Sequence, residues 1–133
     1  MASVAAGRMG LVTGQLVQEL GWDEDVDDAL RIEIEDTVGA EFIEEAVEAV
    51  DVVLLWWRDD DGDLADGLVD ALTDLRDDGV IWLMTPKVGR PGHVEPADIA
   101  EAATTAGLSQ TSTSMVSTEW SASKLVRPRG SRR

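Results

Sequence analysis

The chain has 133 residues, of which 44% are hydrophobic, and this suits a single domain with its own core. Cysteine is absent and histidine occurs once, which excludes a disulfide framework, thiol catalysis and a Cys/His zinc site. The formal net charge of −16 opposes binding to nucleic acid. No apolar run approaches the roughly 20 residues that span a bilayer. Residues 1–14 lack the pattern of a signal peptide. The sequence therefore predicts a soluble, cytoplasmic protein with no membrane contact.

Charge is distributed unevenly along the chain. All 27 acidic residues lie within residues 1–123, whereas residues 124–133 hold five of the eleven basic residues. We expect residues 1–14 to be a flexible N-terminus and residues 128–133 a basic, flexible tail. Between them, residues 15–127 should form a single α/β domain.

The first elements alternate strand and helix. Residues 15–20 are predicted to form a short strand. Asp23 is a suitable N-cap for a helix over residues 24–38, which Gly39 would end. Apolar residues also recur at helical spacing over residues 41–49, and this predicts a second, short helix.

The rest of the chain continues this alternation. Unbroken apolar runs indicate parallel strands that are buried on both faces. Asp63 would cap one helix, which Gly79 would end, and Pro96 suits the first turn of another. The predicted strands cover residues 51–57, 80–84, 109–117 and 120–127, and the predicted helices cover residues 64–76 and 96–106.

These elements predict an α/β fold, namely a three-layer sandwich with a mainly parallel sheet and a C-terminal antiparallel hairpin, Rossmann-like in its connections. The stretches around Leu54 and Leu83 should be neighbouring parallel strands in the middle of the sheet. Of the tryptophans, we expect Trp82 in the core and Trp22 and Trp120 partly exposed near element ends.

From Asp51 onward the order of elements resembles the second half of class I methyltransferase-like domains, including a helix that ends in Ala-Gly-Leu at residues 106–108. The resemblance implies the fold but not the activity. A cofactor site in such a fold needs a glycine-rich turn after the first strand. Residues 19–25 read Glu-Leu-Gly-Trp-Asp-Glu-Asp, with acids where a ligand carboxylate or phosphate would lie. We therefore expect no S-adenosylmethionine site and no cofactor.

The chain also resembles an uncharacterised actinobacterial family of unknown function. This resemblance spans residues 14–128 and rests on Leu55-Trp-Trp-Arg58 and on Thr85-Pro-Lys-Val-Gly-Arg-Pro-Gly-His93. It supports the fold and transfers no site.

The loop after the 80–84 strand carries the candidate binding residues. Ligands of open parallel sheets bind beyond the carboxyl ends of the strands. The loop supplies positive or hydrogen-bonding side chains and glycines whose N–H groups can face an anion. The alternative is that its cations pair with nearby carboxylates and its glycines only form turns. The candidate ligand-binding residues are Arg58, Lys87, Gly89, Arg90, Gly92 and His93.

The sequence thus predicts a small, acidic, non-catalytic binding or regulatory protein that recognises a small anion or a protein partner at these strand ends. The alternative is a transferase-like enzyme that uses the Lys87–His93 loop with Arg58 and has a lost or altered cofactor site. A third interpretation is an acidic mimic of nucleic acid over residues 19–66. The aspartates at 59–63 fail the spacing of a calcium loop, so no metal site is predicted. An exposed edge strand of the hairpin has unpaired backbone groups, so a homo-oligomer formed through this edge is a further alternative.

Overall fold

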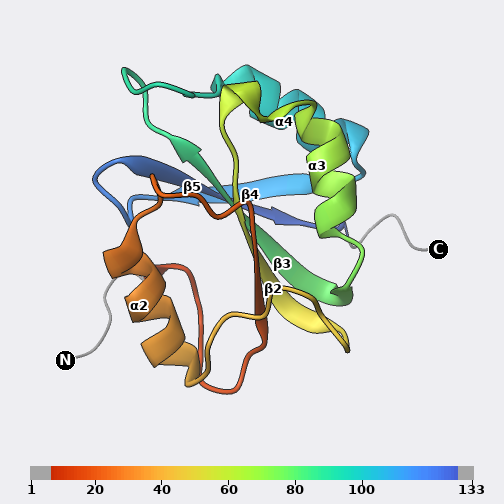
Figure 1. Ribbon diagram of the computed structural model, residues 1–133. Helices are drawn as coiled ribbons and strands as arrows, with labels where there is room; N and C mark the ends of the chain where they lie inside the picture. Colours follow the sequence, from red (N-terminus) through yellow and green to blue (C-terminus); the bar gives the residue numbers. More distant parts are fainter. Residues whose placement is uncertain (1–6, 129–133) are drawn as a thin grey trace.

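Five strands form one sheet in the order β1-β2-β3-β5-β4 in the computed structural model, which describes residues 7–128 (Figure 1). The strands are β1 (Val17–Leu20), β2 (Val50–Trp56), β3 (Leu75–Pro86), β4 (Ser109–Ser114) and β5 (Trp120–Val126). The helices are α2 (Asp28–Val38), α3 (Leu64–Ala71) and α4 (Pro96–Thr105), with a short 3-10 turn η1 (Asp59–Asp61).

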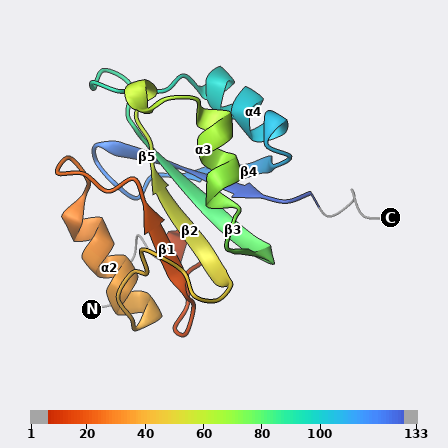
Figure 2. The same ribbon diagram turned by 45° about the vertical axis from the view of Figure 1, so that its right-hand side comes forward.

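The helices cover both faces of the sheet. Helix α2 packs on one face, and α3 and α4 pack side by side on the other (Figures 1 and 2). Successive side chains of β2 alternate between the two cores, because a strand directs them to opposite faces. Leu54 and Trp56 join the α2 side, whereas Val53 and Leu55 join the α3 side. This is the predicted three-layer α/β sandwich.

Strands β2 and β3 are parallel neighbours near the middle of the sheet. Leu54 lies opposite Trp82, and Leu55 lies opposite Leu83. All four side chains are buried, which explains the unbroken apolar runs. The predicted pairing is confirmed. The C-terminal hairpin is antiparallel as expected, and β5 is the strand that adjoins β3. Strand β4 forms the outer edge, and self-association through it stays a prediction.

The predicted helix over residues 41–49 is wrong. Ile43 instead forms an isolated parallel bridge with Gln18 on the outer side of β1. The N–H of Glu19 donates to the Ile43 carbonyl, and the N–H of Ile43 donates to the Val17 carbonyl. Nine residues are too few for a stable helix without packing, and Val47, which the helical spacing placed inward, is 97% exposed. Pairing with β1 therefore overrides the local pattern.

Two predicted helix boundaries are also wrong. Helix α2 begins at Asp28, and its N-cap Asp27 lies four residues after the predicted N-cap Asp23, because the backbone between them makes tertiary contacts such as the one from Trp120 to the Asp25 carbonyl. Helix α3 ends at Ala71, and β3 begins at Leu75. Gly79 does not end the helix, since it lies at an irregularity in the β2–β3 register, where an added Cβ would meet the Asp51 carbonyl oxygen at 2.9 Å.

The folded core includes residues from the described part of the predicted flexible N-terminus, residues 7–14. Met9 and Leu11 are buried against the α2 side of the sheet. The side chain of Thr13 donates to the Thr37 carbonyl, and the N–H of Gly14 donates to the Val38 carbonyl. Residues 1–6 and most of the basic tail lie outside the described residues. None of the helices between residues 7 and 128 is long and apolar enough to cross a lipid bilayer.

Candidate functional site

The chain changes direction across the sheet between β1 and β2. After β1 it runs through α2 to the bridge at Ile43 on one side of β1, and then returns to β2 on the other side. In open α/β sheets, ligands bind outside the carboxyl ends of the strands at such a switch point. Gly21 and Arg58 follow these two carboxyl ends, so they mark the candidate site.

Arg58 joins the two strand ends. Its Nη1 donates to the Gly21 carbonyl at 2.8 Å, its Nε and Nη2 both donate to the Asp25 carboxylate, and Asp61 lies 3.4 Å from Nη1. Only 11% of the Arg58 side chain is exposed. Gly21 has a φ of +80°, and a Cβ there would lie 2.2 Å from the Trp56 carbonyl oxygen. The gap directly between Gly21 and the Trp56 carbonyl is therefore closed by the chain itself.

Trp120 lies beneath the two arginines of the site. The guanidinium carbon of Arg58 is 5.2 Å from the Trp120 ring centroid, and that of Arg90 is 5.8 Å away, both within cation–π range. Trp120 is fully buried, donates to the Asp25 carbonyl and meets Trp56 edge to face. The expectation of a partly exposed Trp120 is thus wrong, because the β5 start is covered by side chains from other loops.

The structure brings part of the predicted binding site together, and Arg90 and His93 pair with other groups of the protein. Arg90 donates to the Glu119 carbonyl and lies 3.5 Å from the Glu119 carboxylate. His93 donates from Nδ1 to the Pro86 carbonyl, and its Nε2 lies 3.5 Å from the Glu95 carboxylate.

The two glycines of the loop and Lys87 contribute to the shape of the loop in different ways. Gly89 and Gly92 both have positive φ. A Cβ at Gly92 would lie 3.0 Å from the Cβ of Arg58, so this glycine makes room for Arg58. Lys87 holds the loop through its backbone N–H, which donates to the Glu119 carbonyl. Within residues 7–128 its ammonium group makes no hydrogen bond or ion pair.

The network changes the acidity of its members. Hydrogen bonds from Arg58 lower the pKa of the Asp25 carboxyl below its ordinary value, although partial burial acts in the opposite direction. Burial alone would lower the pKa of the Arg58 guanidinium, but Asp25 and Asp61 outweigh it and raise that pKa. Arg58 is therefore charged, and its charge is balanced within the protein.

Replacement of Arg58 by Met is expected to lower the free energy of unfolding by about 1–2 kcal/mol at neutral pH, since Asp25 is 45% exposed and water screens part of the pair. The folded chain holds the Asp25 pKa below its unfolded value of about 3.9. The Asp25–Arg58 pair therefore contributes fully to the free energy of unfolding above the unfolded pKa of Asp25. Its contribution disappears as the pH falls through the lower pKa of the folded chain. Urea unfolding of both proteins at neutral pH and near pH 3 measures it. An equal difference at both pH values would contradict the role of Asp25.

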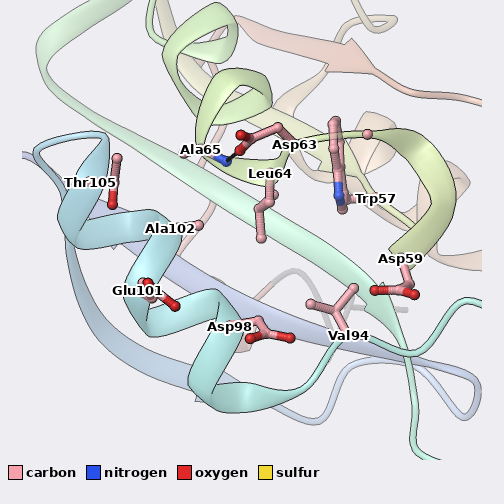
Figure 3. Close-up of a pocket in the computed structure, with 11 residues that line it drawn as sticks. Trp57, Asp59, Asp63, Leu64, Ala65, Val94, Asp98, Glu101, Ala102 and Thr105 are labelled. Atoms are coloured by element: carbon pink, nitrogen blue, oxygen red, sulfur yellow. Dashed lines mark hydrogen bonds between the residues drawn. The ribbon is translucent and has the colours of Figure 1, made fainter.

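A hollow of about 350 Å³ lies beside the switch point, between the start of α3 and helix α4 (Figure 3). Asp98 and Glu101 of α4 form one rim, Asp59 and Asp63 form the other, and the apolar side chains of Leu64 and Val94 lie between them. Trp57 forms one end. Asp63 also caps α3 by accepting from the N–H of Ala65, as predicted. Among residues 7–128, no three acidic or histidine side chains are placed to hold a metal ion together.

A second hollow, of about 420 Å³, adjoins the first at Trp57. It lies between the carboxyl ends of β1 and β2 and helix α3, and Trp22, which is 53% exposed, lines it. The Trp57 ring packs against Gly67 of α3, where an added Cβ would lie 2.5 Å from the ring. Trp56 and Trp57 point to opposite faces as predicted, so only Trp57 reaches this side. The carboxylates that line this hollow belong to Asp23, Asp61 and Asp70.

The acidic hollows are absent from the candidate site derived from the sequence. The sequence predicts Asp23 and Asp63 as helix caps and no metal site at the aspartates of residues 59–63. Asp98, Glu101 and Thr105 recur at spacings of three and four, which places them on one face of α4. That spacing is a usable signal, but it does not reveal that α3 faces the same residues.

Residues 6–129 match the family described as "Protein of unknown function (DUF3052)". The chain belongs to this family. An uncharacterised protein of Mycobacterium tuberculosis is 57% identical to this DUF3052 chain over 129 residues, which cover 96% of this chain and 81% of the relative. An uncharacterised protein of Mycobacterium bovis matches to the same extent. The resemblance to an uncharacterised actinobacterial family is confirmed.

Several solved structures that are similar to the DUF3052 chain are methyltransferases. The mitomycin 7-O-methyltransferase has a TM-score of 0.64 at 12% identity, covering 96% of this chain and 52% of the enzyme. A SAM-dependent methyltransferase from Aquifex aeolicus has a TM-score of 0.58 at 11% identity, covering 93% and 89%. Magnesium protoporphyrin IX methyltransferase from Synechocystis PCC 6803 with bound SAH has a TM-score of 0.58 at 17% identity, covering 95% and 80%. These similarities show a methyltransferase-like, Rossmann-like fold.

Proposed function

We propose that the protein is a small, acidic, non-catalytic binding or regulatory protein on a methyltransferase-like fold, and that it recognises its partner at the carboxyl ends of the central strands. The observation that carries this proposal is the position of Arg58. Its guanidinium bridges the Gly21 carbonyl and Asp25, and so occupies the switch point where a ligand of this fold class would bind.

The residues at the switch point do not fit S-adenosylmethionine or a dinucleotide. An anionic group needs free N–H groups at the first helix N-terminus. In α2 the Asp27 carboxylate already accepts from the N–H of Leu30, and Ser117 donates to its other oxygen. The close approach of Gly21 to the Trp56 carbonyl and the Arg58 guanidinium close the gap directly between these two residues, so a cofactor cannot pass between them. The acidic side chains beside Arg58 and Arg90 favour a cationic partner over a small anion. Binding of a small anion at these strand ends stays a prediction.

A cofactor titration tests the proposal. Isothermal titration calorimetry of the wild-type chain with S-adenosylmethionine and with S-adenosylhomocysteine is expected to give no saturable heat for either ligand. A cofactor site would bind both, and ligand at about 100 times its Kd would stabilise the fold by about 2.7 kcal/mol, visible as a rise in Tm. Saturable binding of both ligands with a matching rise in Tm would contradict the proposal.

A further inference from the structure

Trp57 lines both hollows, which we together call the acidic groove; the first hollow is lined by α3 and α4, and the second by the ends of β1 and β2 and by α3. Arg58 is the only cationic residue that lines it within the described chain, and Arg58 is already paired with Asp25. The carboxylates that line the groove belong to Asp23, Asp59, Asp61, Asp63, Asp70, Asp98 and Glu101.

Several of these carboxylates are available for a ligand. Asp63 caps α3 and Asp61 accepts from the backbone N–H of Arg58, so both serve the fold. Within residues 7–128, the side chains of Asp59, Asp70, Asp98 and Glu101 make no hydrogen bond or ion pair. Asp59, Asp98 and Glu101 lie apart along the first hollow (Figure 3), and among residues 7–128 no three acidic side chains are placed to hold one metal ion. This spacing suits several cations carried on one extended chain better than a single metal ion.

The remaining lining suits long basic side chains. Leu64 and Val94 provide an apolar floor, along which the methylene stems of lysine or arginine can pack. Trp22 and Trp57 present aromatic surface, and a guanidinium or ammonium group over a tryptophan face is attracted by the ring. Tryptophan is also enriched among the residues that dominate binding at interfaces.

From these features we infer that the acidic groove binds a lysine- and arginine-rich segment of a partner protein. The inference rests on the proposed function and specifies its partner. We infer a basic occupant from charge complementarity. The chain has a net charge of −16, and unpaired carboxylates line the acidic groove beside its aromatic side chains.

Within the described chain, Arg127 is already engaged at the start of β3, where it donates to the carbonyls of Leu75 and Arg76, so Arg127 itself is not an occupant of the acidic groove.

Fluorescence anisotropy tests the inference with a labelled decapeptide of alternating lysine and serine. The wild-type chain is expected to bind it with an affinity that falls as salt is added. The double variant Asp98→Asn with Glu101→Gln should raise the Kd about tenfold, since each exposed charge pair contributes a factor of about three. The control, Asp77→Asn with Asp78→Asn, removes the same charge at the exposed start of β3 and should change the Kd less than about twofold. Equal Tm values for the two variants verify that both are folded.

Three results would overturn the inference. They are no binding by the wild type, an equal loss in both double variants, and stronger competition by a peptide of residues 124–133 than by the lysine-serine peptide. The last result would assign the groove to a second copy of this chain. None of them affects the cofactor titration. Conversely, binding of both S-adenosyl ligands would overturn the proposed function whatever the peptide does, so the two failures are distinguishable.

Discussion

Replacement of Arg31 by Met is expected to lower the free energy of unfolding by about 3–5 kcal/mol. Arg31 pairs with Glu19 through two hydrogen bonds of 2.6 and 2.7 Å, and only 5% of the Glu19 side chain is exposed. The hydrogen bonds to Glu19 raise the pKa of the Arg31 guanidinium. Trp56 also donates to Glu19, at 2.9 Å. Without Arg31, a buried carboxylate keeps one neutral donor and no countercharge.

A second ion pair provides the matched control. Arg76 lies 3.0 Å from Asp51, but 47% of its side chain is exposed. Arg76→Met should therefore cost less than about 1 kcal/mol. Urea unfolding of both variants with a common slope measures the difference. Adding Glu19→Gln to Arg31→Met should restore part of the loss, because it removes the uncompensated charge. Similar losses for Arg31→Met and Arg76→Met would contradict this account.

Replacement of Gly21 by Ala is expected to lower the free energy of unfolding by about 2–5 kcal/mol. The positive φ of +80° alone disfavours any side chain by about 1–2 kcal/mol. The new Cβ would also lie 2.2 Å from the Trp56 carbonyl oxygen, so a strand end must move, and such overpacking costs a further 1–3 kcal/mol or so. The displacement would weaken the Arg58 contact with the Gly21 carbonyl.

The variant Gly107→Ala distinguishes the conformational cost of a positive φ from the steric cost of the new Cβ. It has nearly the same φ, +81°, but nothing lies within 4 Å of a Cβ placed there. Gly107→Ala should therefore cost only the conformational part, about 1–2 kcal/mol. Thermal and urea unfolding of the two variants test the prediction. If Gly21→Ala were no worse than Gly107→Ala, the close approach of the β1 and β2 ends would not be a constraint on the fold.

The predicted elements that failed are those where tertiary contacts compete with local pattern. The spacing of residues 41–49 is helical, yet the backbone of Ile43 pairs with β1. Likewise Asp25 follows a suitable N-cap, but its carbonyl accepts from Trp120 and its carboxylate from Arg58, so the helix begins later. Neither partner is near in sequence, and no local signal could indicate them.

The candidate site was predictable in part. The convergence of Arg58 with the Lys87–His93 loop follows from adjacent parallel strands, whose carboxyl ends meet at one edge. The sequence could not show that Arg58 closes the switch point, because that depends on the path of the β1–α2 loop. The first hollow of the acidic groove could not be predicted for the same reason, since it is lined by residues at α3 and α4, and only the packing of these helices makes them face each other.

What the sequence determined by itself is the layering: apolar runs such as Val52–Trp56 must be buried on both faces, and this requires helices on each side of a parallel sheet. The tertiary structure alone decided which charges meet. An ion pair such as Asp25–Arg58 joins residues that are 33 positions apart. Its geometry depends on loop paths, which periodicity does not specify, whereas the burial of a strand depends on the local composition that periodicity records.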